Sequence, residues 1–171
     1  VRVAGDEIND SIAVYLKKVH NLAVGERTAE DIKIKIGSAF PNDEFDQTTM
    51  EVRGLHLLSG LPRCINLTSG EIREAMTDPL NKIVEAVKRT LERTPPELAA
   101  DIVDRGIMLA GGGALVRGIS DLLSHETGIF THIAEDPLFC VVNGCGEVLD
   151  DFKKLRRVVD TPDFARNAIR D

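Results

Sequence analysis

Two stretches near the start of the chain repeat hydrophobic residues every three or four positions, the spacing of an amphipathic helix. Asp6 can act as the N-cap of the first stretch. Its apolar stripe consists of Ile8, Ile12, Tyr15, Leu16 and Val19. Thr28 and Asp31 have the spacing of a capping box at the start of the second stretch. Its narrower apolar face consists of Ile32, Ile36 and Ala39. We predict two helices here, preceded at residues 1–4 by the end of a strand.

The pattern changes over residues 50–67, where apolar and polar positions alternate as in strands with one covered face. Residues 59–62 read Ser-Gly-Leu-Pro, a composition typical of a tight turn. This pattern predicts a β-hairpin. The polar residues 41–49 before it predict a loop.

A helical period returns after the hairpin. Thr68 and Glu71 have the capping-box spacing and predict the start of a short helix. Asp78 and Pro79 predict a restart, because Asp is a good cap and Pro fits the first helical position. The long helix that follows is expected to end at the proline pair 95–96, before a single turn around Leu98.

The last third of the chain has a strand–helix–strand–helix order. Residues 107–110 form a continuous apolar run, which predicts a strand covered on both faces. Three glycines follow, then a helix from Leu115 that Gly128 ends, a strand over 129–134 and a helix over 138–149 capped by Asp136. This order is typical of an α/β domain. Residues 150–171 are charged and weakly periodic, so we expect a frayed helix or a tail.

Composition narrows the class of protein. The chain of 171 residues is 43% hydrophobic and 29% charged, which is ordinary for a globular protein. Its net charge of −7, the interleaved charges and the absence of Trp argue against a nucleic-acid partner. It has no run of about 20 apolar residues and no signal-peptide pattern. Because it starts at Val1 on an apolar alternation, we expect it to be cut from a longer protein.

Cysteine and histidine suggest no special chemistry. Three cysteines without a CxxC spacing lie in apolar surroundings, so we expect reduced, buried, cytosolic thiols. They are Cys64, Cys140 and Cys145. The four histidines show no paired ligand spacing, so we expect no metal site. We also find no Ser/His/Asp or Cys/His nucleophile set and no acidic cluster suited to Mg²⁺.

Three features could bind a ligand or move. Gly111, Gly112 and Gly113 follow a strand, where bare backbone N–H groups can approach a phosphate or the polar edge of a nucleotide. A purely steric need for glycine in the turn explains them about as well. Glu30 and Lys33 share one helix face and could hold ribose and adenine, although such pairs are more often surface ion pairs. Two glycines inside the last helix, Gly144 and Gly146, indicate a close helix crossing or a flexible point.

Several segments closely resemble the MreB family of bacterial actin homologues. The most specific is ERTPPELAADI at 92–102, followed by DRGIMLAGGGAL at 104–115. Further matches are VAGDE at 3–7, GERTAE at 25–30, and AEDPL at 134–138 with Cys140 and Val141. The resemblance covers about residues 1–150 in order and nearly without gaps.

The resemblance implies an α/β, actin-like fold with ribonuclease-H-like topology, of which this chain would be the second of two lobes around ATP. Residues 1–5 would end a strand of the larger subdomain, and residues 6–70 would form a small α+β subdomain. Residues 71–150 would form the larger subdomain, with the last helix hinging the two lobes, and 151–171 would be the C-terminal tail.

The resemblance also implies the site residues. The family's adenosine motif falls on Gly111, Gly112 and Gly113, flanked by Ala110 and Ala114. Its ribose and adenine contacts fall on Glu30 and Lys33, and on Ala29. The phosphate loops, Mg²⁺ and the attacking water would be held mainly by residues before Val1, so we expect little or no ATP hydrolysis by these 171 residues.

The implied function is that of a cytoskeletal ATPase at the inner face of the cell membrane, whose filaments guide cell-wall synthesis and rod shape. Implied partners are further copies of the chain, a RodZ-like membrane protein and the cell-wall synthesis machinery; membrane contact would come through the other lobe or through partners. One alternative is a sugar kinase or heat-shock chaperone lobe, which shares the glycine motif but not the Pro-Pro-Glu-Leu segment. Another is an interaction module that no longer uses nucleotide.

Overall fold

The computed structural model describes residues 3–152. In this part of the chain the helices, including one 3-10 turn, are α1 Gly5–His20, α2 Glu26–Ile36, α3 Asp43–Asp46, α4 Ser69–Glu92, α5 Pro96–Arg105, η1 Gly112–Leu115, α6 Ile119–Thr127 and α7 Cys140–Asp150. The strands are β1 Leu22–Ala23, β2 Thr49–His56, β3 Pro62–Thr68, β4 Ile107–Leu109 and β5 Thr131–Ile133. The expected tail from residue 153 onward lies outside the described residues.

The predicted hairpin is confirmed as antiparallel β2 and β3, with Val52 opposite Ile65. Gly60 in its turn has φ +69°, a conformation that favours glycine. Strand β1 pairs with the far edge of β2 and completes a three-stranded sheet in the order β1-β2-β3. The pattern did not predict β1, because a strand of two residues carries no alternation.

The helix starts differ from their predicted caps. Helix α1 begins at Gly5, and the Glu7 carboxylate accepts the backbone N–H of Ala4 at 2.8 Å, so Asp6 is not the cap. Helix α2 begins at Glu26 with Gly25 as its extended N-cap. The predicted start at Thr28 is therefore wrong, because the helix-forming residues before Thr28 extend the helix by two positions.

Helix α4 opens with the capping box that the sequence predicted. The Thr68 hydroxyl accepts the N–H of Glu71 at 3.3 Å, and the Glu71 carboxylate accepts the N–H of Thr68 at 2.9 Å. The predicted restart at Pro79 is wrong, because α4 continues through it. Proline leaves the carbonyl of Ala75 without its helical donor. The Ser11 hydroxyl on α1 donates to that carbonyl at 2.6 Å and replaces the missing bond.

The last third keeps its predicted order but differs in detail. The expected single turn after the proline pair is the ten-residue helix α5. Strands β4 and β5 pair in parallel, with Met108 opposite His132. Because the Met108 side chain is 64% exposed, the expected cover on both faces of β4 is not present within residues 3–152. Helix α7 starts at Cys140 after Phe139, and Asp136, with φ +47°, is not its cap.

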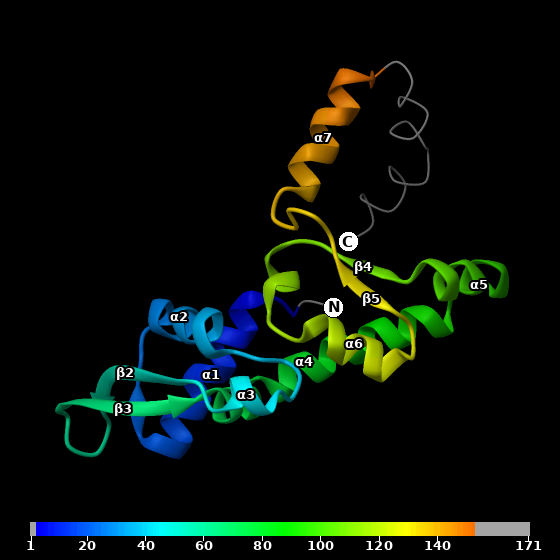
Figure 1. The fold of residues 1–171 in the computed structure, drawn as a ribbon. Coiled ribbons are helices and arrows are strands. Elements are labelled where there is room, and N and C mark those ends of the chain that lie inside the picture. Colours follow the sequence, from blue (N-terminus) through cyan, green and yellow to red (C-terminus); the bar gives the residue numbers. More distant parts are fainter. Residues whose placement is uncertain (1–2, 153–171) are drawn as a thin grey trace, which may run out of the picture.

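One hydrophobic core runs from α1 and α2 through the sheet and α4 to α6. Its fully buried members include Ile12, Leu16, Ile32, Ile72 and Met76. Figure 1 shows α1 beside α4, with α7 projecting away from the rest. None of the residues of α7 is buried. The boundary at residue 70 between two subdomains stays a prediction.

The predicted burial of the cysteines is wrong. Cys64 and Cys145 are exposed and Cys140 is half-buried. Cys64 lies on the outward face of β3, and the other two lie on or at the start of the projecting helix α7. Leu67, three residues after Cys64, belongs to the core, but the alternation along β3 turns Cys64 to the other face. Between residues 3 and 152, no helix is long and apolar enough to cross a membrane.

Candidate functional site

The turn after β4 depends on one glycine with a positive φ. Gly111 has φ +83°, where a side chain would be strained. Its N–H donates to the carbonyl of Pro137 at 2.7 Å, and its own carbonyl accepts the N–H of Ala114 at 3.1 Å. Ala114 is buried and Ala110 is exposed. Glycine at 111 is therefore required by the backbone itself.

The next two glycines are not required by packing. A Cβ on Gly113 would meet nothing within 4 Å, and one on Gly112 would only reach ordinary contact with Leu138, at 3.5 Å. Within residues 3–152, the N–H groups of Gly112 and Gly113 donate to no backbone carbonyl outside their own 3-10 turn. The steric explanation thus accounts for Gly111 alone. The other two present bare backbone donors beside open space.

The residues predicted on α2 lie in three different settings. Ala29 is fully buried in the core, and the Glu30 side chain is exposed. Lys33 is half-buried, and its Nζ lies 3.4 Å from the carbonyl of Gly5 at the start of α1. Among the described residues, Glu30 and Lys33 form no ion pair with each other, so the expected surface pair is not present. The exposed Glu30 carboxylate can meet a ligand or solvent, while the Lys33 ammonium contacts the Gly5 carbonyl.

A backbone contact connects the end of α2 with the segment after the glycine turn. Ser38 and Arg117 form a parallel bridge, and the N–H of Ala39 donates to the Arg117 carbonyl at 2.7 Å. Within residues 3–152, no hydrogen bond joins Glu30 or Lys33 directly to residues 111–114. The structure therefore links the two predicted parts of the site through their flanking backbone. Sequence reasoning missed both Arg117 and the carbonyl of Pro137, since neither belongs to a ligand-type motif.

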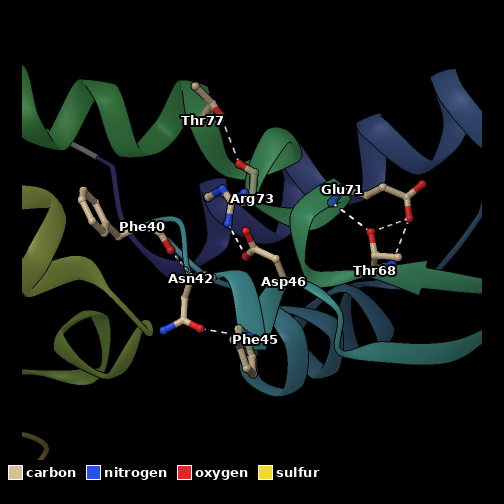
Figure 2. Close-up of polar contacts among 9 residues, drawn as sticks. Phe40, Asn42, Phe45, Asp46, Thr68, Glu71, Arg73 and Thr77 are labelled. Atoms are coloured by element: carbon tan, nitrogen blue, oxygen red, sulfur yellow. Dashed lines mark hydrogen bonds and ion pairs between the residues drawn. The ribbon is translucent and has the colours of Figure 1, made fainter.

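The connection between α2 and β2 carries the strongest polar contacts near this bridge. Arg73 on α4 donates to the carboxylate of Asp46, as Figure 2 shows, and this hydrogen bond lowers the pKa of Asp46. The side chains of this pair are only 25% and 19% exposed. At the other end of α3, Asn42 Oδ1 accepts the N–H of Phe45 at 2.9 Å (Figure 2). These contacts order a segment that the sequence predicted only as a polar loop.

Comparison with known proteins identifies the family. The family model described as MreB/Mbl protein matches residues 1–157. This chain belongs to the MreB/Mbl family. The cell shape-determining protein Mbl of Bacillus subtilis (strain 168) is 45% identical over 155 residues, which are 91% of this chain and 46% of Mbl. The cell shape-determining protein MreB of Escherichia coli (strain K12) is 49% identical over 150 residues, which are 88% of this chain and 43% of MreB.

Solved structures of the MreB/Mbl family confirm the predicted actin-like α/β fold. MreB5 of Spiroplasma citri bound to AMPPNP has a TM-score of 0.85 and 38% identity, over 90% of this chain and 46% of that one. The same protein bound to ADP has a TM-score of 0.84 and 35% identity, over 94% and 48%. A MamK double helical filament, 17% identical with a TM-score of 0.63, shares the fold. The chain spans a little under half the length of these relatives.

Proposed function

We propose that this chain forms the adenosine-contacting side of an ATP site in a filament-forming, cell shape-determining protein of the MreB/Mbl family. The observation that carries the proposal is the pair of glycines at 112 and 113, which expose backbone donors although no neighbouring atom requires a glycine there. Two structures of a related MreB5 hold AMPPNP and ADP. Relatives at 45–49% identity are named for determining cell shape.

The residues present fit a nucleoside at the glycine turn. Backbone N–H groups without side chains can approach a flat, polar base closely, and the missing Cβ atoms leave the space for it. Glu30 would accept hydrogen bonds from the ribose hydroxyls, because its carboxylate is exposed and forms no ion pair within residues 3–152. Lys33, held at the start of α1, would place its positive charge beside the nucleotide. The wall of the nucleoside site would include three alanines, Ala29, Ala110 and Ala114.

The 171 residues supply one side of the proposed site only. Between residues 3 and 152, no group of three or more His, Cys, Asp or Glu side chains could hold a metal ion. As the resemblance implies, Mg²⁺ and the phosphates would be held mainly by residues outside this chain. ATP supplies the phosphoryl chemistry when bound. This chain's part is to bind and orient the nucleoside, so we expect weak or no hydrolysis without the remaining residues.

The bound nucleotide would promote self-association of the protein into filaments. We propose filaments of successive copies in the cytoplasm, at the inner face of the cell membrane. A RodZ-like membrane protein and the cell-wall synthesis machinery would be the partners that convert filaments into rod shape. What supports these partners is only that the relatives are named cell shape-determining proteins.

High-speed pelleting of the full-length gene product, with ATP·Mg²⁺ and without nucleotide, tests the proposal. We expect ATP-dependent sedimentation that is lost in Gly112→Val and Gly113→Val. Thr77→Val is the control, because it also introduces a valine at an exposed position but lies on α4. A protein that binds ATP tightly but stays in the supernatant would favour a kinase or chaperone lobe. Neither binding nor pelleting would favour a nucleotide-free interaction module.

A further inference from the structure

We infer that Arg117 is a positioning residue that couples occupancy of the glycine turn to residues 38–48, which we name the α2–β2 connection. The inference rests on the proposed nucleotide site and adds a route by which a bound nucleotide changes a distant surface. It starts from chain distance: Arg117 lies only four positions after Gly113. The 3-10 turn η1 extends to Leu115 within this interval, and the N–H of Val116 donates to the Gly113 carbonyl at 3.2 Å. A shift of Gly113 towards a ligand is therefore passed on to Arg117.

The backbone at 117–118 lies directly against the α2–β2 connection. Besides its bridge to Ser38 and Ala39, this segment includes Gly118, which has φ +72°. A Cβ on Gly118 would come within 2.9 Å of the Phe40 Cβ and 3.0 Å of the Phe40 nitrogen. Ser38 and Ala39 are only 1% and 6% exposed, so water does not separate the two segments. Movement of 117–118 must move the start of the connection.

The side chain of Arg117 reaches further along the same connection. Its guanidinium carbon lies 3.6 Å from the centroid of the Phe45 ring, the geometry of a cation–π contact. Glu44 and Asp121 line the same hollow of about 410 Å³, but neither forms an ion pair with Arg117 within the described residues. The ring of Phe45 is thus the partner of this charge. Because Phe45 belongs to α3, the contact fixes α3 relative to the glycine turn.

The far end of the connection is anchored on α4. Arg73 binds Asp46, and the N–H of Ser69 donates to the Thr48 carbonyl at 3.0 Å (Figure 2 shows the first of these). Two anchors therefore hold the connection, one at Arg117 and one at α4. The α4 anchor is a part-buried ion pair, while the Arg117 side chain is exposed and easily released. Ligand binding near Gly113 would act on the weaker anchor.

Hydrogen exchange of the full-length gene product, with and without saturating ADP, tests this coupling. We expect ADP to slow exchange in peptides covering 39–48. Arg117→Ala should reduce that ADP-linked protection roughly two- to five-fold, the factor of an exposed cation–π contact, and should weaken ADP binding by the same factor. Arg117→Lys should retain most of the ADP-linked protection and of the ADP affinity, because lysine keeps the positive charge. Arg63→Ala changes an exposed arginine on β3 and is the matched control. It should change neither the ADP-linked protection nor the ADP affinity.

A double-mutant cycle separates coupling from simple destabilisation. Phe45→Leu keeps an apolar side chain but removes the ring, so it should match Arg117→Ala, and the double variant should lose nothing further. Exchange in α1 peptides serves as the internal reference, which a general loss of stability would also change. Unaltered ADP-linked protection in Arg117→Ala, or additive losses in the double variant, overturns the inference while the nucleotide site stands. Absence of ADP binding in the unmodified protein overturns both.

Discussion

The close approach of Gly118 to Phe40 gives a prediction with a matched internal control. Gly118 and Gly128 flank α6, with φ values of +72° and +70°. A Cβ on Gly118 would meet Phe40 at 2.9 Å, whereas one on Gly128 would meet nothing within 4 Å. The alanine variants therefore share the backbone strain, and only Gly118→Ala adds a steric clash.

The expected losses of unfolding free energy follow from the backbone strain and the steric clash. A left-handed conformation costs an alanine about 1–2 kcal/mol. Forcing an extra methyl group into packed surroundings typically costs about 1–3 kcal/mol more. Gly128→Ala should therefore lower the free energy of unfolding by about 1–2 kcal/mol. Gly118→Ala should lower it by about 2–5 kcal/mol, because Phe40 contributes a backbone atom that cannot rotate away.

Urea denaturation followed by far-UV circular dichroism measures both losses, since the chain has one Tyr and no Trp for fluorescence. Each kcal/mol also corresponds to about 2–4 °C in Tm for a chain of this size. Equal losses in the two variants would show that the approach of residues 117–118 to Phe40 is looser than the structure has it. That result would also argue against coupling through the backbone contact between residues 117–118 and Phe40.

Three further predictions concern the cap of α4, the Asp46–Arg73 pair and catalysis. Thr68→Ala should cost about 1 kcal/mol of unfolding free energy through loss of the capping box with Glu71, whereas Thr77→Ala, which removes an exposed hydroxyl, should stay within about 0.5 kcal/mol. Because Arg73 lowers the pKa of Asp46, the pair stabilises the fold above the unfolded pKa of about 3.9 and loses its effect as pH falls through the lowered value. Denaturation curves should therefore separate Asp46→Asn from the unmodified chain at pH 7 and bring them together at the acid end; a constant difference across pH would contradict this cause. Phosphate release by the 171 residues with ATP·Mg²⁺ should stay at background, and turnover similar to the full-length gene product would contradict the one-sided site.

Local chemistry made much of the fold predictable. The hairpin followed from alternation around a Ser-Gly-Leu-Pro turn, and the start of α4 followed from the Thr68 and Glu71 spacing. Both depend on contacts between residues close in the chain. The predicted helix starts at Asp6 and Thr28 were wrong. Several neighbouring positions have similar capping energy, and the sequence alone does not rank them.

The candidate site was predictable in its residue types but not in their arrangement. The glycine triplet and the resemblance pointed to 111–113 and α2, and the family is confirmed. Only the backbone conformation separates Gly111, which is required by its positive φ, from Gly112 and Gly113, which lie beside open space. The adenosine roles of these residues stay predictions, which nucleotide binding by the glycine variants tests.

Sequence patterns were enough to predict the family, the hairpin, the long helices and the position of the glycine turn, because each pattern lies in residues close together in the chain. The tertiary structure decided what depends on residues far apart in the chain. Ser11 keeps α4 continuous through Pro79 by supplying a hydrogen bond to the carbonyl of Ala75. Arg117 meets Phe45 across 72 positions of sequence. No local pattern contains such contacts, since they exist only once the core has brought the segments together.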